Sequence, residues 1–135
     1  MIRQFVMIKP SAVKLGLAPV FFDEFQKKGL TLVWQKRMRL SRSQVEVLYH
    51  PYRCVYWFEE FVEVMTSGGV VISLWLGGED ATESAFEVRE RLRLEYKEYC
   101  EYYDLRVADS EEIALQQLRF LIGDELDNIL KHNSC

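Results

Sequence analysis

The sequence predicts an α+β fold in which helices cover a four-stranded antiparallel sheet. Strand-like runs of apolar residues lie at 3–10, 30–40 and 70–78, and each ends at or just before a proline, a serine or a glycine. Segments with helical spacing of apolar residues and with capping residues at their ends lie between and after these runs. The resulting order of strand, helix, strand, helices, strand, helix, fourth strand and last helix is typical of a split βαβ arrangement.

The first strand has alternating and then continuous apolar residues over 3–10 and ends at Pro10, which cannot donate a hydrogen bond to a sheet. Lys9 therefore lies at the end of a buried strand. Residues 18–29 predict a helix, because apolar side chains recur at helical spacing and basic residues precede a glycine stop. Residues 30–40 predict the second strand.

Two helices and the third strand follow. Ser41 is a typical N-cap and begins a helix that reaches about Tyr49. Residues 56–69 carry apolar side chains at helical spacing before a pair of glycines, and they predict the next helix. The apolar run 70–78 predicts the third strand.

The segment after the third strand leaves one element open. A strongly charged helix begins at Asp80 and is expected to reach about Leu94. In residues 93–105, near-helical spacing would extend this helix, whereas enrichment in tyrosine favours a strand. We predict that an edge strand forms at 98–105.

Capping residues mark both ends of the final helix in the sequence. Ser110 precedes acidic residues and an apolar-periodic run, and Gly123 stops that run. We therefore expect one domain over residues 1–122 and a polar tail of weak helical periodicity over 123–135.

Composition narrows the classes of partner and compartment. The chain has 17 basic and 21 acidic residues and a net charge of −4, which argues against a nucleic acid partner. The cysteines Cys54, Cys100 and Cys135 are odd in number and lack a pattern, so we expect reduced thiols and a cytoplasmic protein. No apolar run approaches the ~18 residues that a membrane span needs. The two histidines, His50 and His132, lie far apart, so no metal site is expected.

Four segments together resemble the nucleoside diphosphate kinase family: "FVMIKPSAVKLGL", "KKGLTLVWQKRMRLSRSQVEVLY", "WFEEFVEVMTSGGVV" and "DSEEIALQQLRFL". They cover most of residues 3–122. The resemblance implies a ferredoxin-like sandwich. It also implies transfer of a phosphoryl group from a nucleoside triphosphate to a nucleoside diphosphate through a phosphohistidine, with magnesium on the phosphates. That chemistry needs a neutral imidazole, cations for the phosphates and an aromatic face for the base.

Some nucleotide-binding residues of the family have counterparts in this chain. By resemblance, Lys9 is the phosphate-side lysine, Tyr49 the active-site tyrosine and Trp57 the base-stacking aromatic residue. Arg93 corresponds to one of two phosphate-gripping arginines. For Tyr49 and Trp57 the alternative is ordinary packing. The alternative for Arg93 is a solvated helix face. On that face the arginines Arg89, Arg91 and Arg93 would pair with Glu87, Glu90 and Glu95.

The stretch "DLRVADSEEIA" matches the catalytic segment of the family, which reads Asn-x-x-His-Gly-Ser-Asp-Ser. Alignment on Asp109 and Ser110 places Arg106 at the histidine. A guanidinium stays protonated at physiological pH and has no free lone pair, so it cannot attack phosphorus. We therefore assign no catalytic residue. The other departures from the family pattern are Tyr103 for asparagine, Val107 for glycine, Ala108 for serine and Gln117 for the glutamate of the last helix.

These observations favour a pseudoenzyme that binds a nucleoside di- or triphosphate weakly, with magnesium accompanying the nucleotide if it binds. An oligomerising or scaffolding module without nucleotide binding is the first alternative, since tyrosine-rich surfaces are enriched at interfaces. The tyrosines concerned are Tyr96, Tyr99, Tyr102 and Tyr103. An active kinase is the second alternative, in which only His50 or His132 could accept the phosphate. The resemblance also implies a homodimer. The family's loop before the catalytic segment is shortened here, so a larger ring is not expected.

Overall fold

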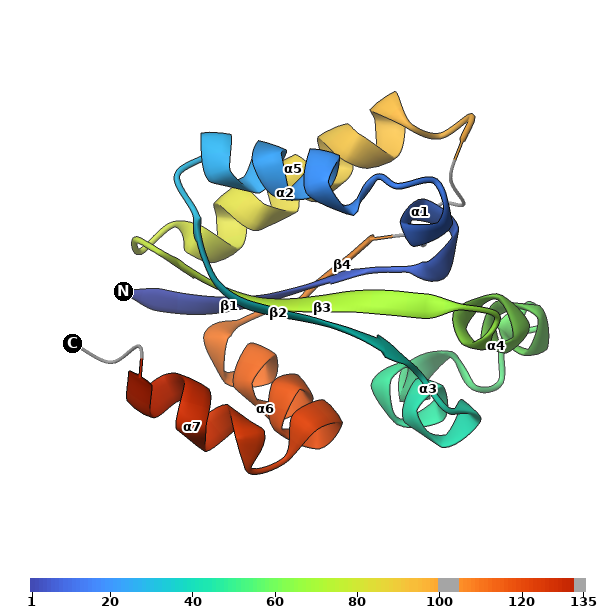
Figure 1. The fold of residues 1–135 in the computed structure, drawn as a ribbon. Helices are drawn as coiled ribbons and strands as arrows, with labels where there is room; N and C mark the ends of the chain where they lie inside the picture. The colour runs from blue at the N-terminus through green and yellow to red at the C-terminus, as the bar shows by residue number, and fades with distance from the viewer. Residues whose placement is uncertain (100–104, 133–135) are drawn as a thin grey trace.

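The computed structural model describes residues 1–99 and 105–132. Its sheet has four strands in the order β2-β3-β1-β4, and every pair of neighbours is antiparallel. The strands are β1 (Ile2–Ile8), β2 (Thr31–Arg39), β3 (Gly69–Gly77) and β4 (Leu105–Val107). The predicted four-stranded antiparallel sheet and the α+β class are confirmed (Figure 1).

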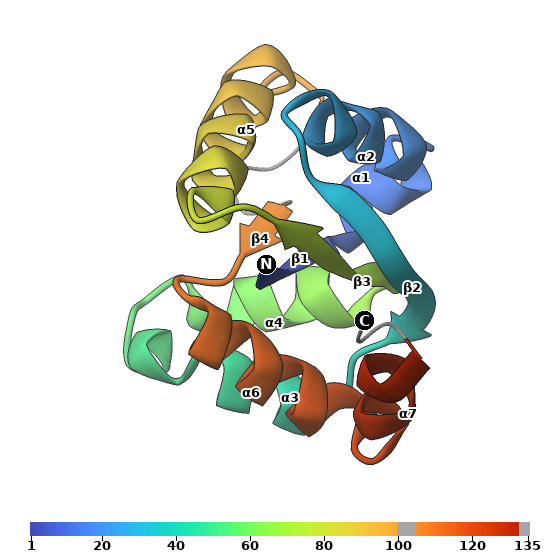
Figure 2. The ribbon, with the colours of Figure 1, turned by 90° about the vertical axis from the view of Figure 1, so that its left-hand side faces the viewer.

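Helices cover both faces of the sheet (Figure 2). On one side lie α1 (Pro10–Lys14), α2 (Ala18–Lys27) and α5 (Ala81–Glu95). On the other side lie α3 (Arg42–Leu48), α4 (Phe58–Thr66), α6 (Glu111–Ile122) and α7 (Glu125–His132). The short 3-10 helix η1 (His50–Tyr52) joins α3 to the loop before α4.

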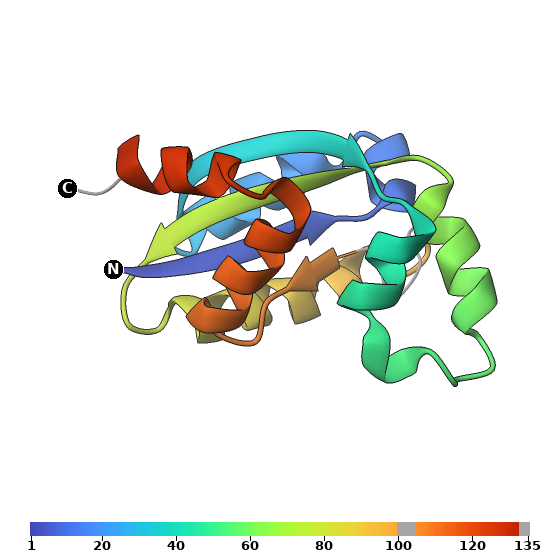
Figure 3. The same cartoon turned by 90° about the horizontal axis from the view of Figure 1, so that it is seen from below.

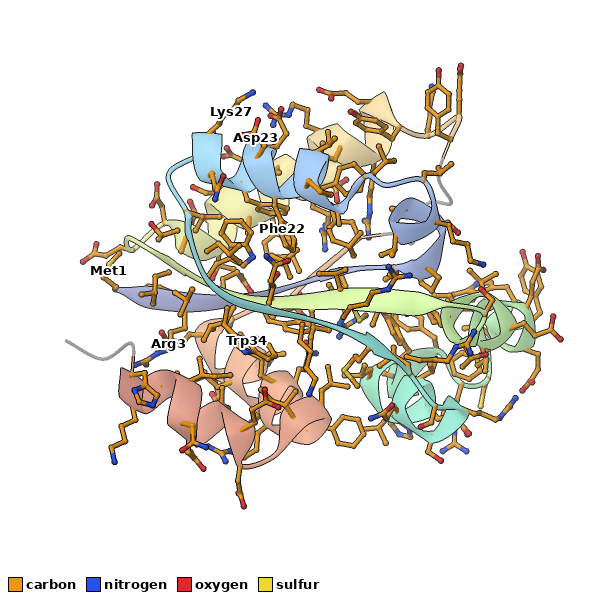
Figure 4. The ribbon with its side chains drawn as sticks, viewed as in Figure 1. Met1, Arg3, Phe22, Asp23, Lys27 and Trp34 are labelled. Carbon is orange, nitrogen blue, oxygen red and sulfur yellow. The ribbon has the colours of Figure 1, made fainter. Side chains whose placement is uncertain are left out.

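Each helical layer has its own hydrophobic core because successive strand residues point to opposite faces. In β1, Val6 and Ile8 face the α2 and α5 layer, whereas Phe5 and Met7 face the other layer. Both sets are fully buried. Figure 4 shows Phe22 of α2 pointing to the sheet, while Asp23 and Lys27 on the same helix point outward.

The predicted helix ends agree with the structure where a capping residue marks them. The Ser41 side chain accepts a hydrogen bond from the Gln44 N–H, and Gln44 bonds the Ser41 backbone in return, which is a capping box. Ser110 caps α6 through the Ile113 N–H. Gly123 ends α6 with a φ of 58°, a conformation that favours glycine. The first strand is shorter than predicted, because Lys9 already caps the short helix α1.

The prediction of an edge strand at 98–105 is wrong over its first part. Residues 96–99 form a turn after α5, and β4 occupies Leu105–Val107, while residues 100–104 lie outside the described chain. The predicted helix end at about Leu94 agrees with α5, which ends at Glu95. Tyr96, the next residue, packs edge-on against Phe21 with ring centroids 5.2 Å apart.

The prediction of a polar tail is wrong for residues 125–132, which form α7 beside α6 (Figure 3). Leu126 and Ile129 are buried in the core, and Trp34 of β2 packs against the same cluster. Lys36 of β2 donates to the Glu125 carboxylate at 3.1 Å. Leu126 and Ile129, three residues apart, share the face of α7 that packs against the core. In the described part of the chain, no helix is both long and apolar enough to cross a bilayer.

Candidate functional site

A cleft of about 760 Å³ opens where the end of β1, the strand β4, the end of α3 and the second half of α5 meet. It is lined by residues from all of these elements and by the start of α4. The structure brings together in this cleft every binding residue that the sequence predicted: Lys9, Tyr49, Trp57, Arg93 and Arg106.

Lys9 stands at the junction between β1 and α1, with only 3% of its surface exposed. Its Nζ lies 5.1 Å from the centroid of the Tyr49 ring and 5.6 Å from that of Phe61. Lysine is almost never this buried unless it is paired or serves a site, so packing alone does not explain its position. The aromatic rings hold the ammonium group at the inner wall of the cleft.

Arg106 occupies the middle of β4, opposite Met7 of β1. Its guanidinium lies over the Tyr49 ring, with Cζ 4.5 Å from the ring centroid, and Nη2 donates a long hydrogen bond of 3.4 Å to the Leu48 carbonyl. The Nε of Arg106 is buried and has no hydrogen-bond partner among the described residues. A buried donor without a partner in a cleft favours a ligand with acceptor oxygens.

The hydroxyl of Tyr49 is also buried and forms no hydrogen bond of normal geometry within the described chain. Burial raises the pKa of Tyr49 to about 12, although the nearby charges of Arg106 and Arg93 act in the lowering direction. The phenol therefore stays protonated near neutral pH and is available as a hydrogen-bond donor.

The arginines of α5 divide between two faces of the helix. Arg89 and Arg93, four residues apart, line the cleft, whereas Arg91 points away and pairs with Glu24 at 2.6 Å. The pairing that the solvated-face alternative predicted is present, since Arg89 and Arg93 both contact Glu90, at 3.1 and 3.3 Å, and Arg91 contacts Glu95 at 3.6 Å. Arg89 and Arg93 line the cleft as well, because positions four apart share a helix face. Arg93 Nη2 donates to the Leu105 carbonyl at 3.1 Å and so connects α5 to β4.

Arg89 is a cleft residue that the sequence reasoning did not select. Its guanidinium packs over the Phe86 ring at 4.4 Å and contacts Glu90 at 3.1 Å. Burial, and then the charge of Arg93, lower the pKa of Arg89. The spacing of four residues from Arg93 was the signal in the sequence that could have identified it.

Aromatic side chains form the other end of the cleft. Trp57 is the N-cap residue of α4. The centroid of its ring lies 5.6 Å from that of Tyr52 and 5.6 Å from that of Phe61. Tyr52 comes from η1 and was not selected from the sequence, because nothing in its local pattern indicates a contact with Trp57. The role of Trp57 in stacking a base stays a prediction.

The charge of the cleft favours an anion. Lys9, Arg89, Arg93 and Arg106 are its basic residues in the described chain, and Asp109 supplies a carboxylate. Among the residues that the structure describes, no group of three or more His, Cys, Asp or Glu side chains could hold a metal ion. His50 in η1 and His132 at the end of α7 are exposed, and neither belongs to the cleft lining.

Comparison with known proteins agrees with this geometry. The family model described as nucleoside diphosphate kinase matches residues 3–90, which is well over half of the chain. The nucleoside diphosphate kinase of Saccharolobus solfataricus is 41% identical over 81 residues, a match that covers 60% of this chain and 58% of that protein. The enzyme of Fervidobacterium nodosum is 37% identical over 69 residues, with 51% of this chain and 47% of that protein covered.

Solved structures show the same fold. The chain superimposes on the nucleoside diphosphate kinase of Encephalitozoon cuniculi with a TM-score of 0.81 and 29% identity, covering 93% of this chain and 91% of that one. A halophilic nucleoside diphosphate kinase from Halobacterium salinarum, solved in complex with CDP, has a TM-score of 0.80 at 24% identity, with coverage of 91% and 88%. On the family match, the sequence relatives and the shared ferredoxin-like sandwich, this chain belongs to the nucleoside diphosphate kinase family.

Proposed function

We propose that the cleft binds nucleoside di- and triphosphates through their phosphates, and that this chain does not pass a phosphoryl group through a phosphohistidine. The observation that carries the proposal is Arg106. Its guanidinium stands on β4 at the inner wall of the cleft, at the position where the family resemblance puts the histidine.

Phosphate binding is supported by the basic residues around Arg106. A guanidinium presents a planar fork of donors that suits phosphate oxygens, and Arg106 already has a buried Nε without a partner in the described chain. Arg89 and Arg93 add two guanidinium groups from α5, and Lys9 adds an ammonium from β1. The Tyr49 hydroxyl can donate one more hydrogen bond to the same anion.

The same residues are unsuited to covalent transfer. A nucleophile for phosphorus needs a free lone pair, which the protonated guanidinium of Arg106 lacks. The Tyr49 hydroxyl in the cleft wall is protonated near neutral pH, and burial raises its pKa further, to about 12. The described lining of the cleft contains no histidine. These features favour binding without turnover.

Magnesium fits this cleft only when the phosphates of a bound nucleotide supply further oxygen ligands. Mg²⁺ prefers oxygen ligands and usually keeps several waters while it is bound by one or two carboxylates and by substrate phosphates. Asp109 is the carboxylate in the described lining, and it would hold such an ion. When bound with the nucleotide, the metal neutralises charge on the phosphate oxygens.

The homodimer that the resemblance implies is also part of this proposal. β2 is an edge strand of nine residues, and its outer side has no strand partner within the described chain. Exposed edges of this kind are suited to pairing with a second copy. Light scattering of the purified chain would test it, and a monomer or a hexamer would contradict the proposal.

The test of binding without turnover combines two measurements on the full chain. Titration calorimetry with ADP and ATP in the presence of Mg²⁺ should show binding. Incubation with labelled ATP and a nucleoside diphosphate should show neither product formation nor an acid-labile phosphoprotein. Steady transfer at a rate comparable to ordinary kinases would overturn the absence of turnover. Absence of any thermal shift with millimolar ATP would instead favour the scaffolding alternative.

A further inference from the structure

The aromatic side chains that line the cleft contact one another. The Tyr52 ring is partly stacked on Trp57, with an interplanar angle of 37° and a centroid distance of 5.6 Å. Phe61 meets Trp57 edge-on at 79° and the same distance. Both distances fall within the range of direct aromatic contact. A base that stacked on the part of the Trp57 ring that Tyr52 contacts would have to displace Tyr52.

The side chains around Trp57 also offer little with which to read a base. Leu48, Pro51 and Phe61 are apolar, and the Tyr52 hydroxyl is the polar group at this end of the described lining. The lining in the described chain has no amide side chain. Its carboxylate, Asp109, acts electrostatically on Arg89 and so belongs with the basic residues. Reading the edge of a base requires positioned donors and acceptors, which this end lacks.

The basic residues of the cleft supply donors for an anion, and Lys9 among them adjoins the aromatic side chains, with its Nζ 5.6 Å from the Phe61 centroid. Arg106 and Lys9 both contact the Tyr49 ring, at 4.5 and 5.1 Å from its centroid, so two like charges lie against one side chain. Arg89 and Arg93 approach from α5, one helical turn apart. Like charges held at short range repel one another, and a polyanion that contacts all of them removes that repulsion.

Building on the proposed function, we infer that the cleft recognises the oligophosphate chain itself and gains little affinity from the base. Inorganic tripolyphosphate is then a ligand comparable to ATP. Where a protein stacks a base on an aromatic side chain, the contact contributes about five- to 150-fold in affinity. That contribution should be largely missing here.

The experiment is titration calorimetry of the full chain with Mg²⁺ and three ligands: ATP, tripolyphosphate and adenosine. We expect ATP and tripolyphosphate to agree within about fivefold and adenosine not to bind. If ATP binds more than about tenfold more tightly than tripolyphosphate, this inference is overturned while the proposed nucleotide binding stands. If neither ATP nor tripolyphosphate binds, both this inference and the proposed nucleotide binding are wrong.

A pair of tyrosine variants tests whether the contact of Tyr52 with Trp57 is the reason that the base contributes little affinity. Tyr52→Ala uncovers the Trp57 ring, so ATP should gain affinity relative to tripolyphosphate by about fivefold or more. Tyr56→Ala is the matched control, because Tyr56 is 97% exposed and is not part of the cleft lining. Its ratio of affinities should equal that of the unchanged chain. Selective loss of ATP affinity in Tyr52→Ala would show that Tyr52 binds the base, and the inference would be wrong.

Discussion

The guanidinium of Arg106 lies on the face of the Tyr49 ring, with Cζ 4.5 Å from the ring centroid. β4 carries the arginine and the end of α3 carries the tyrosine, so the contact joins two segments far apart in the chain. The geometry holds a permanent positive charge at the inner wall of the cleft, where the resemblance to the family places a nucleophile. This charge favours an anion in this part of the cleft.

Arg106→Gln should weaken ATP binding by about tenfold or more, because a hydrogen bond to a charged group contributes about 1.5 to 3 kcal/mol. Titration calorimetry measures the change. Arg91→Gln is the matched control, since Arg91 pairs with Glu24 and Glu95 on the outer face of α5. Equal losses in the two variants would mean that overall charge, rather than the cleft, controls affinity.

Arg106→His should not restore more than trace phosphoryl transfer. An imidazole needs a partner on its second nitrogen to fix its tautomer and orientation. The serine and the glutamate of the family motif are Ala108 and Gln117 here, and Ala108 is buried with no side-chain donor or acceptor. The measurement is acid-labile phosphate on the variant after incubation with ATP. Robust labelling would show that the histidine alone is sufficient.

Tyr49→Phe should change how stability depends on alkaline pH. The pKa of Tyr49 is raised from 10.0 to about 12 by burial, so the folded state prefers the protonated phenol. This preference stabilises the fold fully below the unfolded pKa and is lost as the pH rises from 10 toward 12. Between about pH 9 and about pH 11 the original chain should lose about 1 kcal/mol more than the variant.

Urea unfolding at the two pH values measures that difference. Near neutral pH the variant should be about as stable as the original chain, because the hydroxyl it removes is buried and forms no hydrogen bond of normal geometry within the described structure. Identical pH dependence of the two proteins would mean that the phenol is solvated.

Leu126→Ala should lower the free energy of unfolding by about 2 to 4 kcal/mol, because it removes a buried side chain from the contact between α7 and the sheet. Asn128→Ala is the control on the exposed face of the same helix, with an expected change within about 0.5 kcal/mol. Denaturant unfolding measures both. A loss for Leu126→Ala no larger than for Asn128→Ala would show that α7 does not dock.

Short-range patterns predicted most of the secondary structure. Ser41, Ser110 and Gly123 mark helix ends by capping or by a positive φ, and each effect acts within a few residues. Helical spacing equally well describes residues on either side of Tyr96, so the end of α5 could not be read from it. In the structure Tyr96 follows the end of α5 and its ring contacts Phe21, a pairing that local spacing does not encode.

The sequence by itself determined the α+β class, the family and the arginine at position 106, because each depends on local periodicity or on a short motif. Only the tertiary structure decided that α7 docks through Leu126, that Arg89 turns into the cleft and that Tyr52 covers Trp57. These outcomes depend on contacts between segments that are distant in the sequence. Hydrophobic burial and strand pairing over the whole chain determine which of those contacts form.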